Sequence, residues 1–190
     1  MADYVADWLE QRDGPASDLD LAVLLLNSLD LLEDPADRLD GLDWIAAVLT
    51  HVGHGDLAAA LRPADLAGLR QLRESLRAVF TAGSPGQAAA ILNPMLRQAA
   101  AVPQLVVSGD GARLEVAPGE TGLAALAARL PAALARQVAE QGTARLGTCA
   151  AAPCQCAFVD RTRARIRRFC CTACNDRAAA RVYRQRKRGA

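Results

Sequence analysis

The sequence predicts a mainly α-helical protein in two parts. A helical domain with one β-hairpin covers residues 1–142, and a small module made of a short hairpin and a helix covers residues 143–190. Most apolar residues of the first part recur at helical spacing, between Gly and Pro residues that end helices. Strand-like alternation is confined there to residues 104–116. All six cysteines and half of the basic residues follow residue 148.

Capping and helix-breaking residues place the first helices. Residues 3–12 form a short amphipathic helix that a Gly-Pro pair ends. Ser17 can cap a helix over residues 19–32, which is apolar almost all round and should therefore lie inside a bundle. The pair Asp34-Pro35 indicates a further helix start.

The rest of the helical domain is expected to hold longer helices and the hairpin. The helices cover residues 40–53, 63–83, 84–101 and 121–141, with breaks or kinks at Pro94 and Pro131. Residues 104–107 and 112–116 form two short strands around a Ser-Gly-Asp-Gly turn. With 190 residues and 52% hydrophobic content, the chain can bury one aliphatic core and a small appended module.

The distribution of charge also divides the chain, close to the boundary between the two predicted parts. Residues 149–190 carry eleven Arg and Lys against two Asp, a net charge of +9, whereas residues 1–148 carry eleven against nineteen acidic residues, a net charge of −8. This asymmetry predicts an anionic partner for the C-terminal part. The acidic part would either compete for the same arginines or keep the protein soluble. Arginine outnumbers lysine by 21 to one, which suggests a bacterial genome of high GC content.

The cysteines have the spacing of metal ligands. They fall at Cys149, Cys154, Cys156, Cys170, Cys171 and Cys174. Zinc takes four thiolates or imidazoles in a tetrahedron, and the outer frame of Cys149, Cys154, Cys170 and Cys174 offers two chelating pairs for one Zn²⁺ per chain. Structural disulfides are the alternative, but the N-terminus does not resemble a signal peptide for export to an oxidising compartment. Spacing alone leaves open which four cysteines bind the metal.

Basic residues surround the second cysteine group. Residues 158–163 and 165–169 resemble the arms of a small hairpin, and residues 175–188, rich in Ala and Arg, predict a helix. Arg177, Arg181, Arg184 and Arg188 fall in a stripe of about 60° on that helix, opposite Ala179, Val182 and Tyr183, which can pack on the module. The stripe has no acidic residue three or four positions away, so a polyanion is a favourable partner.

The run from residue 149 to residue 188 resembles the CGNR zinc finger. That family has the pattern C-x4-C-x3-F-x-D-x-[ST]-R, then an aromatic residue before a third cysteine, a C-G-N-R signature and an Arg-rich helix. The matching residues are Cys149, Cys154, Phe158, Asp160, Thr162, Arg163, Phe169, Cys170, Cys174 and Arg177. Cys174-Asn175-Asp176-Arg177 replaces the signature and keeps its cysteine. The resemblance implies a small treble-clef-like finger with four cysteine ligands, in which Cys156 and Cys171 are the spare thiols.

The helical part resembles the ABATE domain, the usual N-terminal companion of this finger. Residues 21–30 are similar to the L-A-L-D-x-x-N-T-x-D opening of that domain, with Leu24 in place of its first Asp and with Asn27 and Asp30 retained. The acidic residue followed by Trp in that family is met by Asp43-Trp44.

These resemblances imply a cytoplasmic, nucleoid-associated transcription regulator that depends on zinc and binds duplex DNA. The expected DNA contacts are Arg163, Arg165, Arg167, Arg168, Arg177, Arg181, Arg184 and Arg188. The helical domain would sense a small-molecule effector, with Asn27 as the candidate contact, or assemble into a homodimer. The alternative is an interaction protein whose basic tail binds RNA or an acidic protein.

Enzymatic and membrane functions are not predicted. We find no Ser, His and acid arrangement and no phosphate-binding Gly-rich loop, and a frame of four cysteines leaves zinc no open catalytic position. His51 and His54 lack partners at ligand spacing and are expected to be surface or capping residues. The longest apolar run is too short to cross a membrane.

Overall fold

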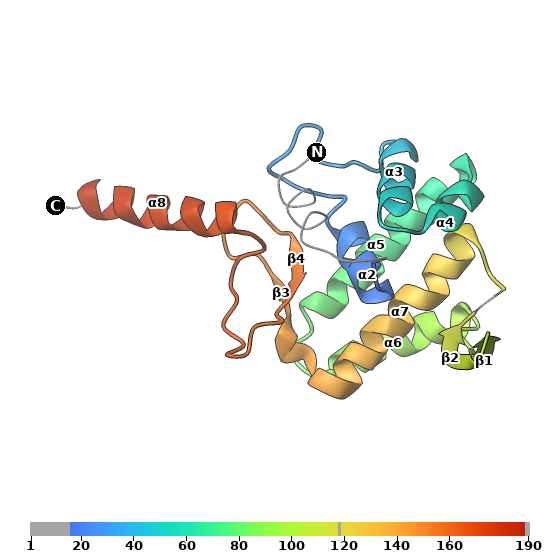
Figure 1. The fold of residues 1–190 in the computed structure, drawn as a ribbon. Helices are drawn as coiled ribbons and strands as arrows, with labels where there is room; N and C mark the ends of the chain where they lie inside the picture. The colour runs from blue at the N-terminus through green and yellow to red at the C-terminus, as the bar shows by residue number, and fades with distance from the viewer. Residues whose placement is uncertain (1–15, 118, 189–190) are drawn as a thin grey trace.

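The computed structural model describes residues 16–117 and 119–188, so the helix expected over residues 3–12 lies outside the described part of the chain. A helical body is joined to a small β-containing lobe, and a last helix extends from that lobe away from the body (Figure 1). The main features of the predicted class are confirmed, since the fold is mainly helical with two short hairpins and a C-terminal cysteine cluster.

Helix α2 (Asp18–Leu26) lies at the centre of the body. Ser17 caps it, and Ser17 and Asp20 form a reciprocal capping box. Seven of its nine residues are buried, as its apolar composition predicts. The helix ends at Leu26, six residues before the predicted end, and an irregular loop follows.

An ion pair holds that loop in place. Both terminal nitrogens of Arg73, which is buried, donate to the Asp37 carboxylate at 2.6 and 2.8 Å, and Arg73 also donates to the Ser28 hydroxyl. The Arg73 guanidinium hydrogen-bonds Asp37 and lowers the pKa of that carboxyl. No helix starts at Asp34-Pro35, and the expectation of one was wrong because these long-range contacts organise the loop.

Helices α5 (Leu66–Phe80) and α7 (Gly122–Gln141) pack against α2, and α6 (Pro85–Gln98) packs on both of them. Helix α3 (Asp43–His51) packs on α4 (Gly55–Ala60), which contacts α7, and a 3₁₀ turn at Pro63–Asp65 precedes α5. Helix α4 was not predicted. Helices α6 and α7 continue through Pro94 and Pro131, so neither proline breaks its helix. Gly122 has a φ of +53°, and a Cβ there would lie 2.9 Å from the Ala60 carbonyl oxygen, so glycine lets α7 start against the end of α4.

Strands β1 (Pro103–Ser108) and β2 (Gly111–Val116) form the predicted hairpin, in an antiparallel register that pairs Leu105 with Leu114. A second hairpin pairs β3 (Leu146–Thr148) with β4 (Ala157–Val159). The arms expected at residues 158–163 and 165–169 do not pair with each other. Residues 160–171 instead form an irregular loop before α8 (Thr172–Arg188).

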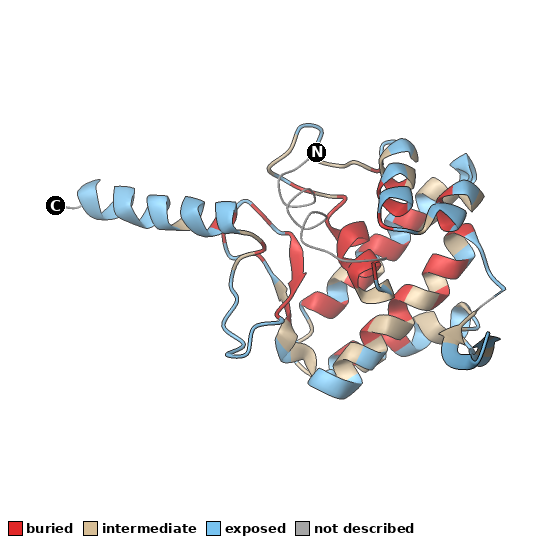
Figure 2. Cartoon of the chain, in the orientation of Figure 1, coloured by how far each residue is buried: buried red, intermediate tan, exposed pale blue. Residues whose placement is uncertain are grey.

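The helical body and the β3–β4 lobe share one continuous apolar core. Buried residues of β4 and buried cysteines of the lobe belong to the same cluster as α2, α5 and α7 (Figure 2). Helix α8, by contrast, is exposed along its length apart from Cys174 and the half-buried Ala178. Across the described residues, no helix combines the length and the apolar character that crossing a membrane requires.

Candidate zinc centre and nucleic-acid interface

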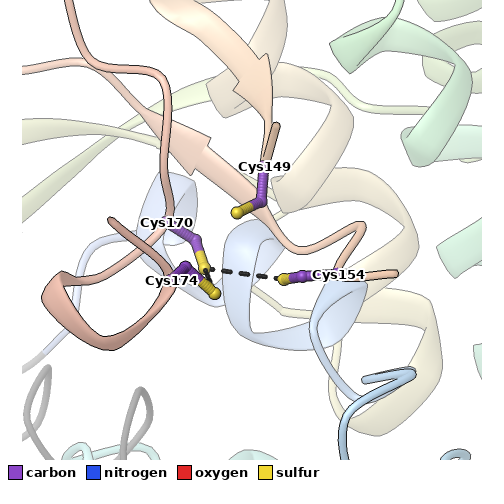
Figure 3. A group of neighbouring side chains, drawn as sticks. All are labelled: Cys149, Cys154, Cys170 and Cys174. Carbon is purple, nitrogen blue, oxygen red and sulfur yellow. Dashed lines mark hydrogen bonds between the residues drawn. The ribbon is translucent and has the colours of Figure 1, made fainter. Parts of the chain in front are cut away.

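Four cysteine sulfurs meet where the β3–β4 lobe joins α8 (Figure 3). Cys149 follows β3, Cys154 precedes β4, Cys170 precedes α8, and Cys174 lies in the first turn of that helix. All four side chains are buried, and their Sγ atoms lie within 4.8 Å of one another. The structure therefore brings together the four cysteines of the predicted outer frame.

The spacing of these sulfurs fits a zinc ion. Tetrahedral coordination with Zn–S bonds of about 2.3 Å places neighbouring sulfurs about 3.8 Å apart. The measured separations are 3.7 Å between Cys154 and Cys170 and 3.6 Å between Cys170 and Cys174. Four thiolates supply a complete coordination shell, so Zn²⁺ bound here has a structural role.

The cysteine cluster holds protons that zinc would displace. Hydrogen bonds from Cys156 and Cys170 lower the pKa of Cys154 to about 2, and the hydrogen bond to Cys154 raises the pKa of Cys170. Burial raises the pKa of Cys174 to about 12. Four sulfurs this close cannot all ionise without a cation, and a bound divalent metal replaces the protons and satisfies the thiolates together.

Two further cysteines lie beside the frame. Cys171 is half-buried, and its sulfur is 3.8 Å from that of Cys170. Cys156 is fully buried, and its sulfur lies within 4.8 Å of both the Cys154 sulfur and a carboxylate oxygen of Asp30. Neither belongs to the set of four mutually close sulfurs, which agrees with their expected status as spare thiols.

The ring of Phe158 on β4 packs over Gly147 on β3. It lies opposite Gly147 in the β3–β4 register, and a Cβ on Gly147 would lie 2.7 Å from the phenyl ring. Glycine therefore makes room for the ring. The guanidinium of Arg167 lies 5.0 Å from the ring centroid, and it also donates to the carbonyls of Phe169 and Cys170.

Asp160 shapes the loop between the strands and α8. Its buried carboxylate accepts hydrogen bonds from the Thr162 backbone and hydroxyl at 2.8 and 2.6 Å, and from the Arg167 backbone at 2.9 Å. Burial alone would raise the pKa of Asp160, but these bonds and nearby Arg145 lower it overall. Arg145 also donates to the Asp160 and Thr162 carbonyls. These hydrogen bonds hold the loop in a conformation that leaves the side chains of residues 161–168 exposed.

Asn27 joins the helical body to the finger. Its side-chain amide donates to the Ala157 carbonyl at 3.0 Å, and its oxygen accepts from the Ala157 backbone N–H at 2.7 Å. Asn27 is 2% exposed, so both ends of the amide are used inside the protein. The structure thus assigns Asn27 a structural role in place of the expected contact with an effector.

Comparison with protein families agrees with this arrangement. A family model described as "Putative stress-induced transcription regulator", ABATE, matches residues 19–144, about two thirds of the chain. The chain belongs to the ABATE family. A CGNR zinc finger model matches residues 145–187. No curated protein matches the chain.

In this ABATE protein, the retained motif residues face the finger. Asn27 bonds β4, and Asp30 lies beside Cys154 and Cys156. The residue at the last signature position, Arg177, donates to the Cys174 sulfur at 3.2 Å. Asn175 and Asp176, which replace the Gly and Asn of the signature, are exposed on α8 and contact none of the four sulfurs through a hydrogen bond.

The arginines expected to bind DNA separate into two groups. Arg167 donates to the Cys170 carbonyl, and Arg177 donates to the Cys174 sulfur. The Arg168 guanidinium lies over the Phe169 ring. Within residues 16–117 and 119–188, no protein partner is found for the other five expected contacts, which are exposed: Arg163, Arg165, Arg181, Arg184 and Arg188. The same holds for Arg186 and Lys187, which were not among the expected contacts.

Two further contacts between the domains were not predicted. Arg77 of α5 donates to the Gln155 carbonyl at 3.3 Å, and Arg161 pairs with Asp20 at 2.5 Å. Arg77 also donates to the Leu26 carbonyl within the helical domain, at 2.7 Å. A basic residue within the helical stretch over residues 63–83 is ordinarily a surface residue. No local pattern distinguishes one that reaches a carbonyl 78 positions away.

Proposed function

We propose that this ABATE protein is a zinc-dependent, DNA-binding transcription regulator of the cytoplasm, associated with the nucleoid. Its finger contacts duplex DNA, and its helical domain senses a ligand or assembles. We retain the division into a helical domain of residues 1–142 and a finger of residues 143–190. Both matching families are regulatory or zinc-binding, and neither is an enzyme family.

The observation that carries the DNA-binding proposal is the exposure of α8. It is a helix of 17 residues that projects from the lobe (Figure 1) and is exposed apart from Cys174 and the half-buried Ala178 (Figure 2). Its basic side chains beyond Arg177 have no partner among the described residues. An isolated helix of this length is marginal in water, and like charges at i and i+4 weaken it further. A polyanion would neutralise the charges and stabilise the helix.

The loop over residues 161–168 supplies the second part of the proposed interface. Asp160 closes the loop, and Arg163 and Arg165 project from its exposed surface. Zinc joins this loop to α8 through Cys170 and Cys174, so the metal fixes the two basic segments relative to each other. Duplex DNA, with regularly spaced phosphates, suits two such segments held in a fixed geometry.

The test measures binding of the zinc-loaded full chain to duplex DNA over a range of salt concentrations. With six to eight phosphate contacts, log K should fall with log salt at a slope of about −5 to −7. Replacing Arg181 and Arg184 by Ala should make that slope less steep by about two. Arg97→Ala, an exposed arginine on α6, is the matched control and should leave affinity and slope unchanged.

The same measurement decides between partners. Duplex DNA, single-stranded RNA and an acidic protein should be compared at equal salt. Tighter binding to RNA or to the acidic protein, with no measurable binding to DNA, would replace the regulator by an interaction protein. Unchanged DNA affinity and salt slope in the Arg181 and Arg184 variant would remove α8 from the interface.

A further inference from the structure

Ile166 is exposed in the basic loop between β4 and α8. Its side chain is 73% exposed, more than any other large apolar side chain in the described residues. The whole run of residues 161–168 is exposed, and five of its eight residues are arginines. A single exposed Ile is common on protein surfaces, so the backbone and the charges around it decide whether it has a role.

The backbone on both sides of Ile166 is held in place. Arg165, directly before it, has a φ of +53°, a left-handed conformation that a non-glycine residue adopts only where surrounding contacts maintain it. The Arg165 N–H donates to the Thr162 carbonyl at 3.4 Å. The Arg167 N–H, directly after Ile166, donates to the buried Asp160 carboxylate at 2.9 Å. The loop therefore presents an apolar side chain to solvent in a fixed position.

The charges beside Ile166 favour an anionic partner. Arg163 and Arg165 are exposed and have no protein partner among the described residues. Arg167 and Arg168, in contrast, lie over aromatic rings of the finger. One short loop thus combines two free guanidinium groups with one exposed apolar side chain.

We propose that Ile166 is an apolar wedge that enters the minor groove of duplex DNA and unstacks a base step there. Proteins that bind the minor groove combine arginines, which the negative potential of a narrow groove attracts, with an apolar side chain that kinks the duplex. The proposal rests on the proposed DNA binding by the finger. It adds the groove that the loop enters and the deformation that it produces, while α8 binds phosphates.

A wedge requires a single apolar side chain on a rigid support. Unstacking a base step costs free energy, and a loop that became ordered only on binding would add a loss of conformational entropy. The hydrogen bonds to Asp160 supply that order in the free protein. A membrane surface is the other anionic partner that accepts an apolar residue, but one Ile buries too little apolar area for stable membrane binding.

Bending of duplex DNA by the zinc-loaded full chain tests the proposal. The duplex is rich in A·T pairs with TA steps at its centre, because these steps unstack readily. Energy transfer between dyes at its two ends measures the bend, and 2-aminopurine in the central step reports unstacking. The wild type should bend the duplex by at least about 20° and raise the 2-aminopurine fluorescence.

Substitutions at Ile166 separate the wedge from the phosphate contacts. Ile166→Ala should abolish the bend and the fluorescence change and lower the affinity about tenfold. The salt slope should stay the same, because the lost side chain carries no charge. Ile166→Leu keeps the apolar volume and should retain the bend. Val107→Ala removes a similarly exposed side chain from the β1–β2 hairpin and should change neither bend nor affinity.

These variants change exposed side chains and are expected to fold, which zinc content and helical circular dichroism verify. A straight duplex in the wild-type complex, or a bend that Ile166→Ala retains, would overturn the wedge and leave DNA binding intact. Failure of the wild type to bind any duplex would overturn the proposed function together with the wedge. Binding to vesicles of phosphatidylethanolamine and phosphatidylglycerol that Ile166→Ala abolishes, without DNA bending, would assign the residue to a membrane surface instead.

Discussion

At the scale of single residues, the position of a sulfur separates a zinc ligand from a neighbouring thiol. Cys154 and Cys156 are two positions apart, and both are buried. The Cys154 sulfur lies within 4.8 Å of those of Cys149, Cys170 and Cys174, whereas the Cys156 sulfur is grouped only with Cys154 and Asp30. Side chains at i and i+2 can share one side of an extended segment, so sequence spacing alone does not distinguish them.

Serine substitution should reveal this difference. We expect Cys154→Ser to lose the single zinc ion, because a serine hydroxyl does not replace a thiolate, and Cys156→Ser to retain one zinc per chain. Cys171→Ser should behave like Cys156→Ser. Zinc measured by elemental analysis after exchange against a mild chelator checks the prediction. Loss of zinc from Cys156→Ser combined with its retention in Cys154→Ser would reverse the ligand assignment.

At the scale of elements, one carboxylate orders the basic loop between β4 and α8. Asp160 accepts two backbone N–H bonds and one hydroxyl bond while remaining buried. Because the pKa of this group is lowered in the folded protein, its stabilising contribution is present above its unfolded pKa. The contribution is lost as the pH falls through the folded value. Acidification below about pH 4 should therefore loosen the loop.

Asp160→Asn should loosen the same loop at neutral pH. An amide can accept from Thr162, but its NH₂ group then faces the Arg167 N–H, and one charge-assisted bond is lost. We expect a loss of about 1–3 kcal/mol in the free energy of unfolding. Hydrogen exchange at the Thr162 and Arg167 amides should be faster, with zinc content unchanged.

Asp176→Asn, on exposed α8, is the control for that substitution and should change the free energy of unfolding by less than about 0.5 kcal/mol. Equal exchange rates at Thr162 and Arg167 in Asp160→Asn and the wild type would show that the carboxylate does not order the loop.

At the scale of the whole molecule, the finger is part of the protein core. Its Ala157 is fully buried and bonded to Asn27, and Arg77 and Arg161 add further links. Within residues 16–117 and 119–188, no ion pair joins the acidic body to an arginine of α8. Among the described residues, the ion pair that joins the tail to an acidic group is Arg161 with Asp20.

Asn27→Ala tests the connection between the domains. The change leaves the buried N–H and carbonyl of Ala157 without partners, so we expect the free energy of unfolding to fall by about 2–4 kcal/mol. Zinc should pass to a chelator faster, because β4 is held less firmly. Chemical denaturation and chelator competition measure the two effects. Asn175→Ala, on the exposed surface of α8, should produce neither.

Asn27→Ala matching the wild type in both measurements would show that the two parts are energetically independent. Faster zinc loss without a change in global stability would restrict the coupling to the lobe.

Local patterns in the sequence determined the helical class, the hairpin of residues 103–116, a metal site made of cysteine pairs and the basic helix, whereas the choice of four ligands among six cysteines came from the family resemblance and agrees with the structure. Helical periodicity, a turn signal and chelating pairs each depend on residues that are close in the chain. The same reasoning placed the arms of the second hairpin in the wrong segments. It also took the apolar side of α8 to be packed, although Val182 and Tyr183 are 45% and 66% exposed.

Only the tertiary structure decided which residues meet across long separations. Asn27 and Ala157 are 130 positions apart, and Asp20 and Arg161 are 141 apart. A polar residue on a helix has the same local pattern whether it faces solvent, an effector or another domain. Its partner is set by the packing of elements around a shared core and a common metal site, and no single segment encodes that packing.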